Sequence, residues 1–309
     1  MRGDRPAELV LGSVQLGLPY GAANRTGKPA RETALRLLQR AADAGVGAFD
    51  TARAYGDAEE RLGEALAGRR ARTITKLSPL SELTLDASAE SACAAVERSI
   101  EQSLIALRRS SLDCVLLHRA AHLTAYEGAI WDRLQRYVAS GTVASLGVSV
   151  QSPAEAHRAL SEAQVEHLQL PFNLLDWRWR ESGVIAEIQK RRSVTVHARS
   201  VFLQGVLSAN DISVWPAIER HDARATLNWL NDQVHRCKRE NAADLCLAYV
   251  RAQDWIDGVV VGMETEAQLE ANLSLTARAP LKPDQCAIID ASRPRVPEQL
   301  LDPAQWPRR

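Results

Sequence analysis

The chain has few cysteines, few methionines and no excess charge of either sign. Its five cysteines among 309 residues include no C-x-x-C pair, which argues against a disulfide framework or a zinc site and for a reducing compartment. Lys and Arg number 38, as do Asp and Glu, so no basic surplus points to nucleic acid or to an anionic membrane. We therefore expect a globular protein without a metal site, a nucleic-acid partner or a membrane partner.

Long apolar runs and glycine-rich phosphate motifs are missing as well. No stretch approaches the roughly 18 apolar residues of a membrane span, and no apolar signal segment follows the opening MRGDRPAELVLG. Neither G-x-G-x-x-G after a strand nor G-x-x-x-x-G-K-[ST] occurs, which argues against a doubly wound dinucleotide fold and a P-loop. We expect a cytoplasmic protein, present as a monomer or a small homo-oligomer.

What the chain does contain is a regular alternation of short apolar runs and amphipathic stretches. The helical pattern includes RETALRLLQRAADAG (31–45), a proline-led start at 152–153, and the segments 181–192 and 222–241. The strand-like runs are ELVLGS (8–13), VGAFDTA (46–52), TITK (73–76), LDCVLLH (112–118), VASLGVS (143–149), EHLQLPF (166–172), VTVHARS (194–200) and DGVVVGM (257–263).

Eight strand–helix units predict an α/β fold in which the parallel strands close into a (β/α)8 barrel. No shift in composition marks a domain boundary, so we expect one domain over residues 1–309 with its core at about 8–275. Residues 276–309 are rich in proline, and we expect them to form an irregular tail that wraps or covers the barrel.

Three successive predicted strands end in an ionisable residue: Asp50, Lys76 and His118. Tyr55 follows five residues after Asp50, close enough to stay at the same end of the barrel. Because catalytic groups of such barrels lie at the carboxyl ends of the strands, these four side chains are expected to meet. Taken singly, each also has a structural interpretation: a loop cap, a surface lysine, a core histidine and a loop anchor.

This set of groups suits proton transfer to a carbonyl oxygen. A phenol is a weak acid at neutral pH, so Tyr55 needs a nearby cation, which Lys76 can supply, while Asp50 neutralises that buried ammonium. His118 can direct the substrate oxygen toward the phenol. A reduction also needs a hydride donor, and a nicotinamide cofactor is the obvious one.

The same motifs resemble those of the aldo-keto reductase superfamily. FDTARAYGDAEERLGEAL, ITKLSP, VLLHRA and LGVSV occur in that family's order, and the resemblance covers about residues 8–275. It implies a (β/α)8 barrel that binds extended NAD(P)H without a Rossmann motif and reduces aldehydes or ketones. The family's catalytic tetrad falls on Asp50, Tyr55, Lys76 and His118.

The resemblance also assigns cofactor positions. Ser149 and Gln169 fall where the family holds the nicotinamide carboxamide, although Val150 replaces the more usual asparagine. Arg199 falls where an aromatic residue often stacks on the nicotinamide, and a guanidinium can stack instead. The backbone of residues 200–207 would follow the pyrophosphate. The residues implied along that segment are Ser200, Phe202, Gly205 and Leu207.

The adenine end of the cofactor is implied by VGMETEAQLEANL, which resembles the family's G-x-x-x-x-x-Q-L-x-x-N element. The residues implied there are Gly262, Glu264, Gln268 and Asn272. NADP(H) is the family's usual cofactor. Three glutamates (264, 266 and 270) and no basic residue occupy this stretch; they would repel a 2′-phosphate, so a relaxed or NAD(H)-leaning preference is also expected.

The function expected from this resemblance is NAD(P)H-dependent reduction of a small carbonyl compound, with a polar, sugar-like substrate favoured. Tyr20 and Trp177 are expected among the substrate contacts. Two alternatives remain open: a regulatory subunit that binds the nucleotide but turns over negligibly, and a cofactor-free lyase or isomerase that uses Lys76 as a Schiff-base amine.

Overall fold

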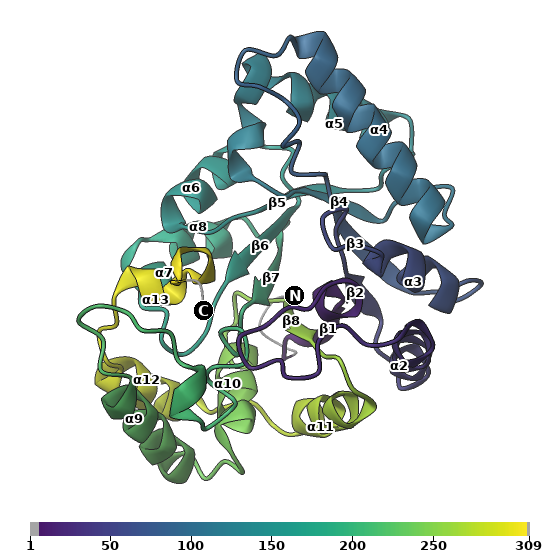
Figure 1. Cartoon of the computed structure of the whole chain (residues 1–309). Coiled ribbons are helices and arrows are strands. Elements are labelled where there is room, and N and C mark those ends of the chain that lie inside the picture. Colours follow the sequence, from purple (N-terminus) through teal and green to yellow (C-terminus); the bar gives the residue numbers. More distant parts are fainter. Residues whose placement is uncertain (1–5, 308–309) are drawn as a thin grey trace.

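The computed structural model describes residues 6–307, and within that range eight parallel strands close into a barrel in the order β1 to β8 (Figure 1). Each strand pairs with the next in the chain, and β8 pairs with β1 to close the ring. The expected (β/α)8 barrel is thereby confirmed. The strands are β1 (Glu8–Gly12), β2 (Ala48–Asp50), β3 (Arg72–Lys76), β4 (Cys114–Leu117), β5 (Leu146–Ser149), β6 (His167–Pro171), β7 (Thr195–Arg199) and β8 (Gly258–Gly262).

The strands are buried on both faces, which is why they read as continuous apolar runs. One set of alternating side chains fills the barrel interior: Val10, Ala48, Ile74, Cys114 and Leu116 form a cluster of their own. The intervening side chains, such as those of Phe49 and Leu117, belong to the much larger core between sheet and helices. This period of two also directs the last residue of several strands into the barrel mouth.

The helices form the outer layer around the barrel (Figure 1). Several begin where the sequence places a capping residue: the Ser152 hydroxyl accepts a hydrogen bond from Glu155 N at the start of α6, and Thr265 forms a capping box with Gln268 at the start of α11. The principal helices are α2 (Arg31–Asp43), α3 (Ala58–Ala65), α4 (Ala89–Leu107), α5 (Ala129–Ala139), α6 (Pro153–Ser161), α8 (Val184–Lys190), α9 (Ala223–Arg236), α10 (Ala242–Arg251) and α11 (Glu266–Ala277).

The prediction of one helix over 222–241 is wrong in its C-terminal bound. Helix α9 ends at Arg236, and a separate helix, α10, begins at Ala242. Two local features explain the break. Lys238 adopts a left-handed backbone with φ of 53°, and the Asn241 side chain accepts a hydrogen bond from Asp244 N, which makes it the N-cap of a new helix.

The described part of the expected tail, residues 276–307, is also more regular than expected. It contains α12 (Pro283–Ser292) and the single turn α13 (Glu298–Leu301). Pro283 stands in the first turn of α12, where a missing N–H costs nothing. Ile289 and Leu300 are fully buried, and Tyr249 of α10 donates a hydrogen bond to Asp290 of α12. The prolines therefore start a packed helix instead of preventing one.

Short helices connect the strands near the barrel mouth. These are α1 (Val14–Gly17) after β1 and α7 (Arg178–Glu181) after β6. Among the described residues, no helix is both long enough and apolar enough to cross a membrane.

Candidate active site

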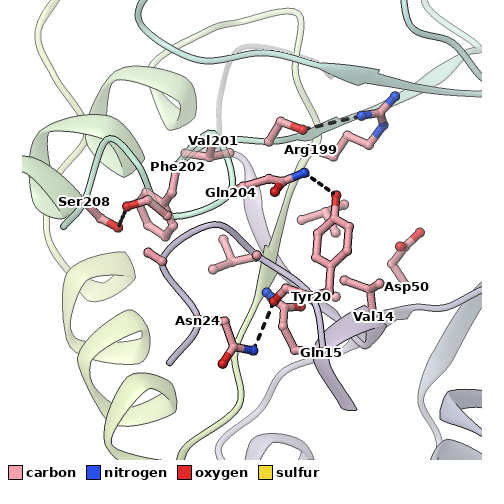
Figure 2. Close-up of a pocket in the computed structure, with 18 of the residues that line it drawn as sticks. Val14, Gln15, Tyr20, Asn24, Asp50, Arg199, Val201, Phe202, Gln204 and Ser208 are labelled. Carbon is pink, nitrogen blue, oxygen red and sulfur yellow. Dashed lines mark hydrogen bonds between the residues drawn. The ribbon is translucent and has the colours of Figure 1, made fainter. Parts of the chain in front are cut away.

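A cavity of about 860 Å³ opens at the carboxyl ends of the strands (Figure 2). Its lining comes from the segments after β1, β2, β4, β5, β7 and β8 and from the start of α10 and one side of α11. Most of the expected site residues line it: Tyr20, Asp50, Tyr55, His118, Ser149, Arg199, Ser200, Phe202, Gly205, Gly262, Glu264, Gln268 and Asn272. The barrel thus gathers residues that lie more than 200 positions apart around one cavity.

Asp50 and Lys76 form a buried ion pair beside this cavity. The Lys76 ammonium lies 2.7 Å from both Asp50 carboxylate oxygens and donates a third hydrogen bond to Thr51 O at 3.0 Å. Lys76 is 1% and Asp50 3% exposed. Burial by itself lowers the pKa of Lys76, but Asp50 and Tyr55 raise it by more, so the net pKa lies above its ordinary value. The lysine is therefore a fixed cation.

Tyr55 stands between this cation and His118. The Lys76 Nζ atom lies 5.1 Å from the centre of the Tyr55 ring, and the rings of Tyr55 and His118 meet edge to face with centres 5.9 Å apart. The loop carrying Tyr55 is tied to β3, because Thr51 N donates to Ile74 O at 2.8 Å. The four predicted catalytic side chains are thus brought together.

His118 is an uncharged imidazole in this setting. Burial lowers its pKa to about 3, and the charges of Lys76, Arg199 and Arg119 act in the same direction. Its Nδ1 atom is buried and has no hydrogen-bond partner among the described residues. A neutral ring with one N–H can donate a hydrogen bond to an oxygen in the cavity without carrying charge itself.

Gln169 lies behind the cavity lining, next to Ser149 in the sheet register. Its Nε2 donates to Asp50 Oδ2 at 2.7 Å, so the carboxylate is held by Gln169 as well as by Lys76. Its Oε1 is buried without a partner among the described residues. An unsatisfied buried acceptor is costly, and here it stands directly beside a cavity wall.

Arg199 reaches across the ends of two strands. Its Nη2 donates to Gln151 Oε1 at 2.7 Å and to Val150 O at 3.1 Å, and its Nη1 donates to Ser200 Oγ at 3.4 Å. All three acceptors are uncharged. The guanidinium therefore has no carboxylate partner among the described residues, and it lines the cavity in the position where the resemblance places the nicotinamide.

The segment after β7 bends sharply over the cavity. Ser200, Leu203 and Gln204 all have positive φ, of 61°, 47° and 55°, and Gly205 approaches Ala23 so closely that a Cβ would lie 2.6 Å from the Ala23 Cβ. Phe202 lines the cavity, whereas Leu207 is fully buried and does not. Of the residues expected along this segment, Leu207 therefore does not reach the cavity with its side chain.

The same segment is bonded to the loop after β1. Gln204 donates through Nε2 to the Tyr20 hydroxyl at 3.3 Å (Figure 2). Ala23 N donates to Gln204 O at 3.2 Å. Arg25 and Asp211 form an ion pair farther along the same two segments. These contacts join the two segments beside the cavity, and Tyr20 lines it; its role as a substrate contact stays a prediction.

At the α11 end, Gln268 is already engaged. Its Oε1 accepts from Glu264 N at 2.8 Å and its Nε2 donates to Glu264 Oε1 at 3.1 Å. It therefore shapes the turn before α11 and holds Glu264 in place at the cavity. Asn272 lines the cavity one turn farther along the helix.

The three glutamates of this stretch do not act together. Only Glu264 lines the cavity. Glu266 forms ion pairs with Arg36 and Arg40 of α2, and Glu270 pairs with Arg40. Basic residues distant in the sequence thus neutralise two of the three carboxylates, and the expected acidic character of this end rests on Glu264 alone.

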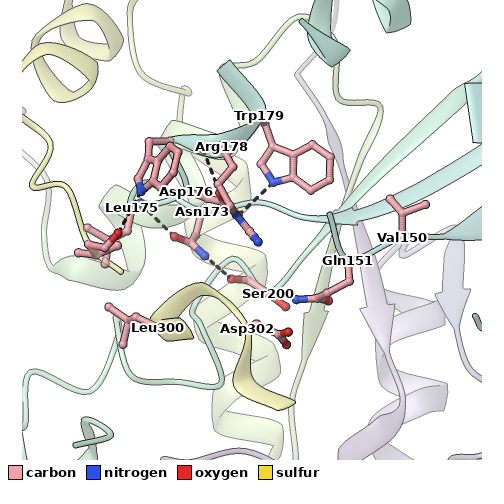
Figure 3. A network of polar contacts seen from close by, with 12 residues as sticks. Val150, Gln151, Asn173, Leu175, Asp176, Arg178, Trp179, Ser200, Leu300 and Asp302 are labelled. Atoms are coloured by element: carbon pink, nitrogen blue, oxygen red, sulfur yellow. Dashed lines mark hydrogen bonds and ion pairs between the residues drawn. The ribbon is translucent and has the colours of Figure 1, made fainter. Parts of the chain in front are cut away.

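Trp177 lies away from the cavity. Its indole N–H donates to Val296 O at 3.1 Å, and the Arg295 guanidinium stacks 3.5 Å from its ring centre. The neighbouring Asp176 accepts from Arg178 and from the Trp179 indole at 3.0 Å (Figure 3). Trp177 therefore joins the loop after β6 to the C-terminal segment, and it does not line the cavity in which the substrate is expected.

The loop after β6 nevertheless reaches the site through Asn173. The Asn173 Nδ2 donates to Ser200 O at 3.3 Å, and its Oδ1 accepts from Leu175 N at 3.0 Å (Figure 3). The carbonyl of a residue with left-handed backbone is thereby held at the cavity wall.

Sequence reasoning missed several polar residues of the lining, among them Gln15 and Arg119. Gln15 Oε1 is buried without a described partner, and its side chain occupies the space that a Cβ on Gly262 would need, 2.1 Å away. Arg119 directly follows His118 and donates to Ser81 Oγ at 3.3 Å. The available signal was position: both lie within three residues of the end of a strand.

Comparison with known proteins agrees with the fold. The chain is 27% identical over 300 residues to norsolorinic acid reductase of Emericella nidulans, covering 89% of this chain and 75% of that protein. Its fold is similar to that of the aldo-keto reductase AKR11C1 of Bacillus halodurans in its holo form, with a TM-score of 0.77, 22% identity and 96% of each chain covered. The sequence pattern of the aldo/keto reductase family matches residues 8–294, and the chain belongs to that family.

Proposed function

We propose that this protein reduces an aldehyde or ketone to an alcohol with NAD(P)H, using Tyr55 as the general acid. The observation that carries the proposal is the arrangement of Tyr55 between Lys76 and His118, with Lys76 held by Asp50 at 2.7 Å. Family membership supports the reaction class, and the relative from Emericella nidulans is itself named as a reductase.

The residues fit a nicotinamide cofactor. The cavity volume of about 860 Å³ lies toward the upper end of small-molecule sites, which run to about 1,000 Å³. Unpartnered amide atoms stand at or beside it: Oε1 of Gln15, Nε2 of Gln151 and Oε1 of Gln169. Ser149 and Gln169 would hold the carboxamide of the nicotinamide, and Asn272 would lie near the adenine. The bound cofactor would supply the hydride.

In this proposal Tyr55 gives its proton to the carbonyl oxygen of the substrate. The Lys76 ammonium stabilises the phenolate that is left, because the two charges are of opposite sign and Asp50 keeps the ammonium in place. The uncharged His118 donates a hydrogen bond to the same carbonyl oxygen and thereby fixes the direction from which the proton arrives.

The two alternatives are less well supported. A Schiff-base lyase needs a neutral amine open to its substrate, whereas Lys76 is buried, makes three hydrogen bonds and has a raised pKa. A regulatory subunit that does not turn over substrate has no need for a complete set of catalytic residues. In this chain all four are present and adjacent: Asp50, Tyr55, Lys76 and His118.

For the cofactor we propose a preference for NADH over NADPH. Glu264, in the turn between β8 and α11, is the one charged residue that residues 258–277 contribute to the described cavity lining. A 2′-phosphate beside its carboxylate would be repelled. Two arginines of α2 reach α11, but both are engaged there: Arg36 and Arg40 form ion pairs with Glu266 and Glu270.

A titration of the purified protein with NADPH and with NADH, followed through tryptophan fluorescence, tests the proposal. Saturable binding together with oxidation of the reduced nucleotide by a reactive aldehyde supports a reductase. Tight binding without turnover of any test aldehyde would support the regulatory alternative, and binding of neither nucleotide would leave the cofactor-free alternative.

A further inference from the structure

Two arginines face the reacting end of the cavity without an acidic partner. Arg119 follows His118 directly, and Arg199 ends β7; both line the cavity. Neither forms an ion pair with any described carboxylate. The hydrogen-bond acceptors of Arg199 are a backbone carbonyl, an amide and a hydroxyl, and that of Arg119 is the hydroxyl of Ser81.

The remaining charges near these arginines leave a positive balance. Asp50 and Lys76 neutralise each other. Glu155 is the other acidic residue at this end of the lining, and one of its oxygens accepts from Gln151 N at 2.6 Å. The positive field reaches the site itself, because both guanidinium groups lower the pKa of His118, although burial is the larger cause.

The topology separates these arginines from the proposed adenine end. Strands β4 and β8 lie four positions apart in a closed ring of eight, so their loops stand on opposite sides of the mouth. Glu264, Gln268 and Asn272 come from the β8 side, whereas Arg119 comes from the β4 side. A cofactor that extends from α11 to Ser149 would therefore leave Arg119 for the substrate.

We propose that the substrate is a carbonyl compound that carries an anionic group, a carboxylate or a phosphate, recognised by Arg119 with support from Arg199. This inference rests on the proposed reductase function and names its substrate class. Of the five N–H groups of Arg199, three are engaged, so two remain for an anion. Arg119 has four beyond its bond to Ser81. Guanidinium groups bind both anions through paired N–H donors.

The experiment compares matched substrates that differ in charge. 4-Carboxybenzaldehyde is paired with its methyl ester, and glyceraldehyde 3-phosphate with glyceraldehyde. We expect the charged member of at least one pair to have the higher kcat/KM, by about tenfold or more at low salt, since a charge-assisted hydrogen bond is worth about 1.5–3 kcal/mol. The pair with the larger ratio identifies the anion. Raising the ionic strength should lower that ratio.

Substitutions test which arginine causes the preference for the charged substrate. Arg119→Gln is expected to lower the ratio of charged to uncharged substrate toward one, and Arg199→Gln to lower it in part. The control is Arg98→Gln, which removes an exposed arginine of α4 outside the cavity and should leave the ratio unchanged. Binding of each probe to the protein saturated with NAD⁺, followed by calorimetry, gives the same ratio without turnover.

Failure of this inference differs from failure of the proposed function. A ratio near one in the unaltered protein, or a ratio that both variants leave unchanged, overturns the anionic substrate while the reductase function stands. Absence of nucleotide binding and of all carbonyl reduction overturns both.

Discussion

The imidazole rings of His167 and His197 meet edge to face inside the barrel, with their centres 4.2 Å apart. Both side chains are buried, and both nitrogens of His197 and Nε2 of His167 have no hydrogen-bond partner among the described residues. Burial lowers the pKa of His167 to about 3 and lowers that of His197 as well, with Arg72 and Lys76 acting in the same direction. The pair is therefore held neutral.

This pair predicts loss of stability in mild acid. A histidine with a lowered pKa binds no proton when folded but binds one when unfolded below about pH 6.5, so the free energy of unfolding falls as the pH drops from there toward the folded pKa. At pH 5 the cost is about 2 kcal/mol for His167, whose folded pKa is about 3, and His197 adds a cost of the same sign. Urea unfolding between pH 7.5 and 5 measures it. Replacing His197→Gln should flatten the dependence by about 1.4 kcal/mol per pH unit; an unchanged slope would contradict this account.

The proposed role of Tyr55 as the general acid predicts a large loss of kcat when its hydroxyl is removed. Tyr55→Phe removes the proposed proton donor but keeps the ring beside Lys76 and His118. We expect kcat to fall by about 10²–10⁴-fold, the usual contribution of general acid catalysis, with nucleotide affinity nearly unchanged. Tyr137→Phe, on the outer helix α5, serves as the control. Comparable activity of the two variants would exclude Tyr55 as the acid.

The buried ion pair predicts different outcomes for stability and for activity. Asp50→Asn leaves the Lys76 ammonium without its counterion, which should cost about 3–5 kcal/mol of unfolding free energy. Burial, which lowers the pKa of Lys76, is then opposed by Tyr55 but no longer by Asp50, so activity should disappear at a lower pH than in the unaltered protein.

A double variant separates the two effects. Replacing Asp50→Leu together with Lys76→Met removes both charges, and apolar replacement of a buried pair is often neutral for stability. We expect urea unfolding to recover toward the original value while carbonyl reduction stays low. Recovery of both properties would show that the pair serves folding alone.

The preference for NADH predicts the effect of one substitution at the α11 end. Glu264→Gln removes the only carboxylate that this side of the described cavity lining presents, so affinity for NADPH should rise while affinity for NADH changes little. Ratios of dissociation constants from parallel titrations measure this. Glu270→Gln, outside the lining, is the matched control, and an equal response of the two variants would argue against a local repulsion.

The hydrogen bonds of Arg191 predict that replacing it lowers the stability of the fold without changing the active site. Its guanidinium donates to four backbone carbonyls, of Leu160, Glu162, Ala163 and Val165, at 2.6–2.7 Å, and so fixes the link between α6 and β6. A lysine cannot reach all four acceptors, so Arg191→Lys should lower the unfolding free energy by about 1–3 kcal/mol. Activity at a temperature well below unfolding should persist. The exposed neighbour gives the control Arg192→Lys, and an equal effect there would refute the assignment.

The sequence was sufficient to predict the barrel because each strand carries its own local signal. Short apolar runs, buried on both faces, alternate with amphipathic stretches, and capping residues such as Ser152 mark helix starts. The same locality explains the errors. The break at Lys238 depends on one backbone angle, and the helix from Pro283 is stabilised by packing on α10, which no local pattern records.

For the site, the sequence by itself determined which chemical groups end the strands, because the order of Asp50, Lys76 and His118 follows from strand boundaries and barrel topology. Only the tertiary structure decided which charged side chains lie around these groups and which of them are paired. Arg36 and Arg40 reach Glu266 and Glu270 from more than 200 residues away, and Arg119 and Arg199 share one cavity from opposite halves of the chain. Charges act through distance in space, and only the closed barrel sets those distances.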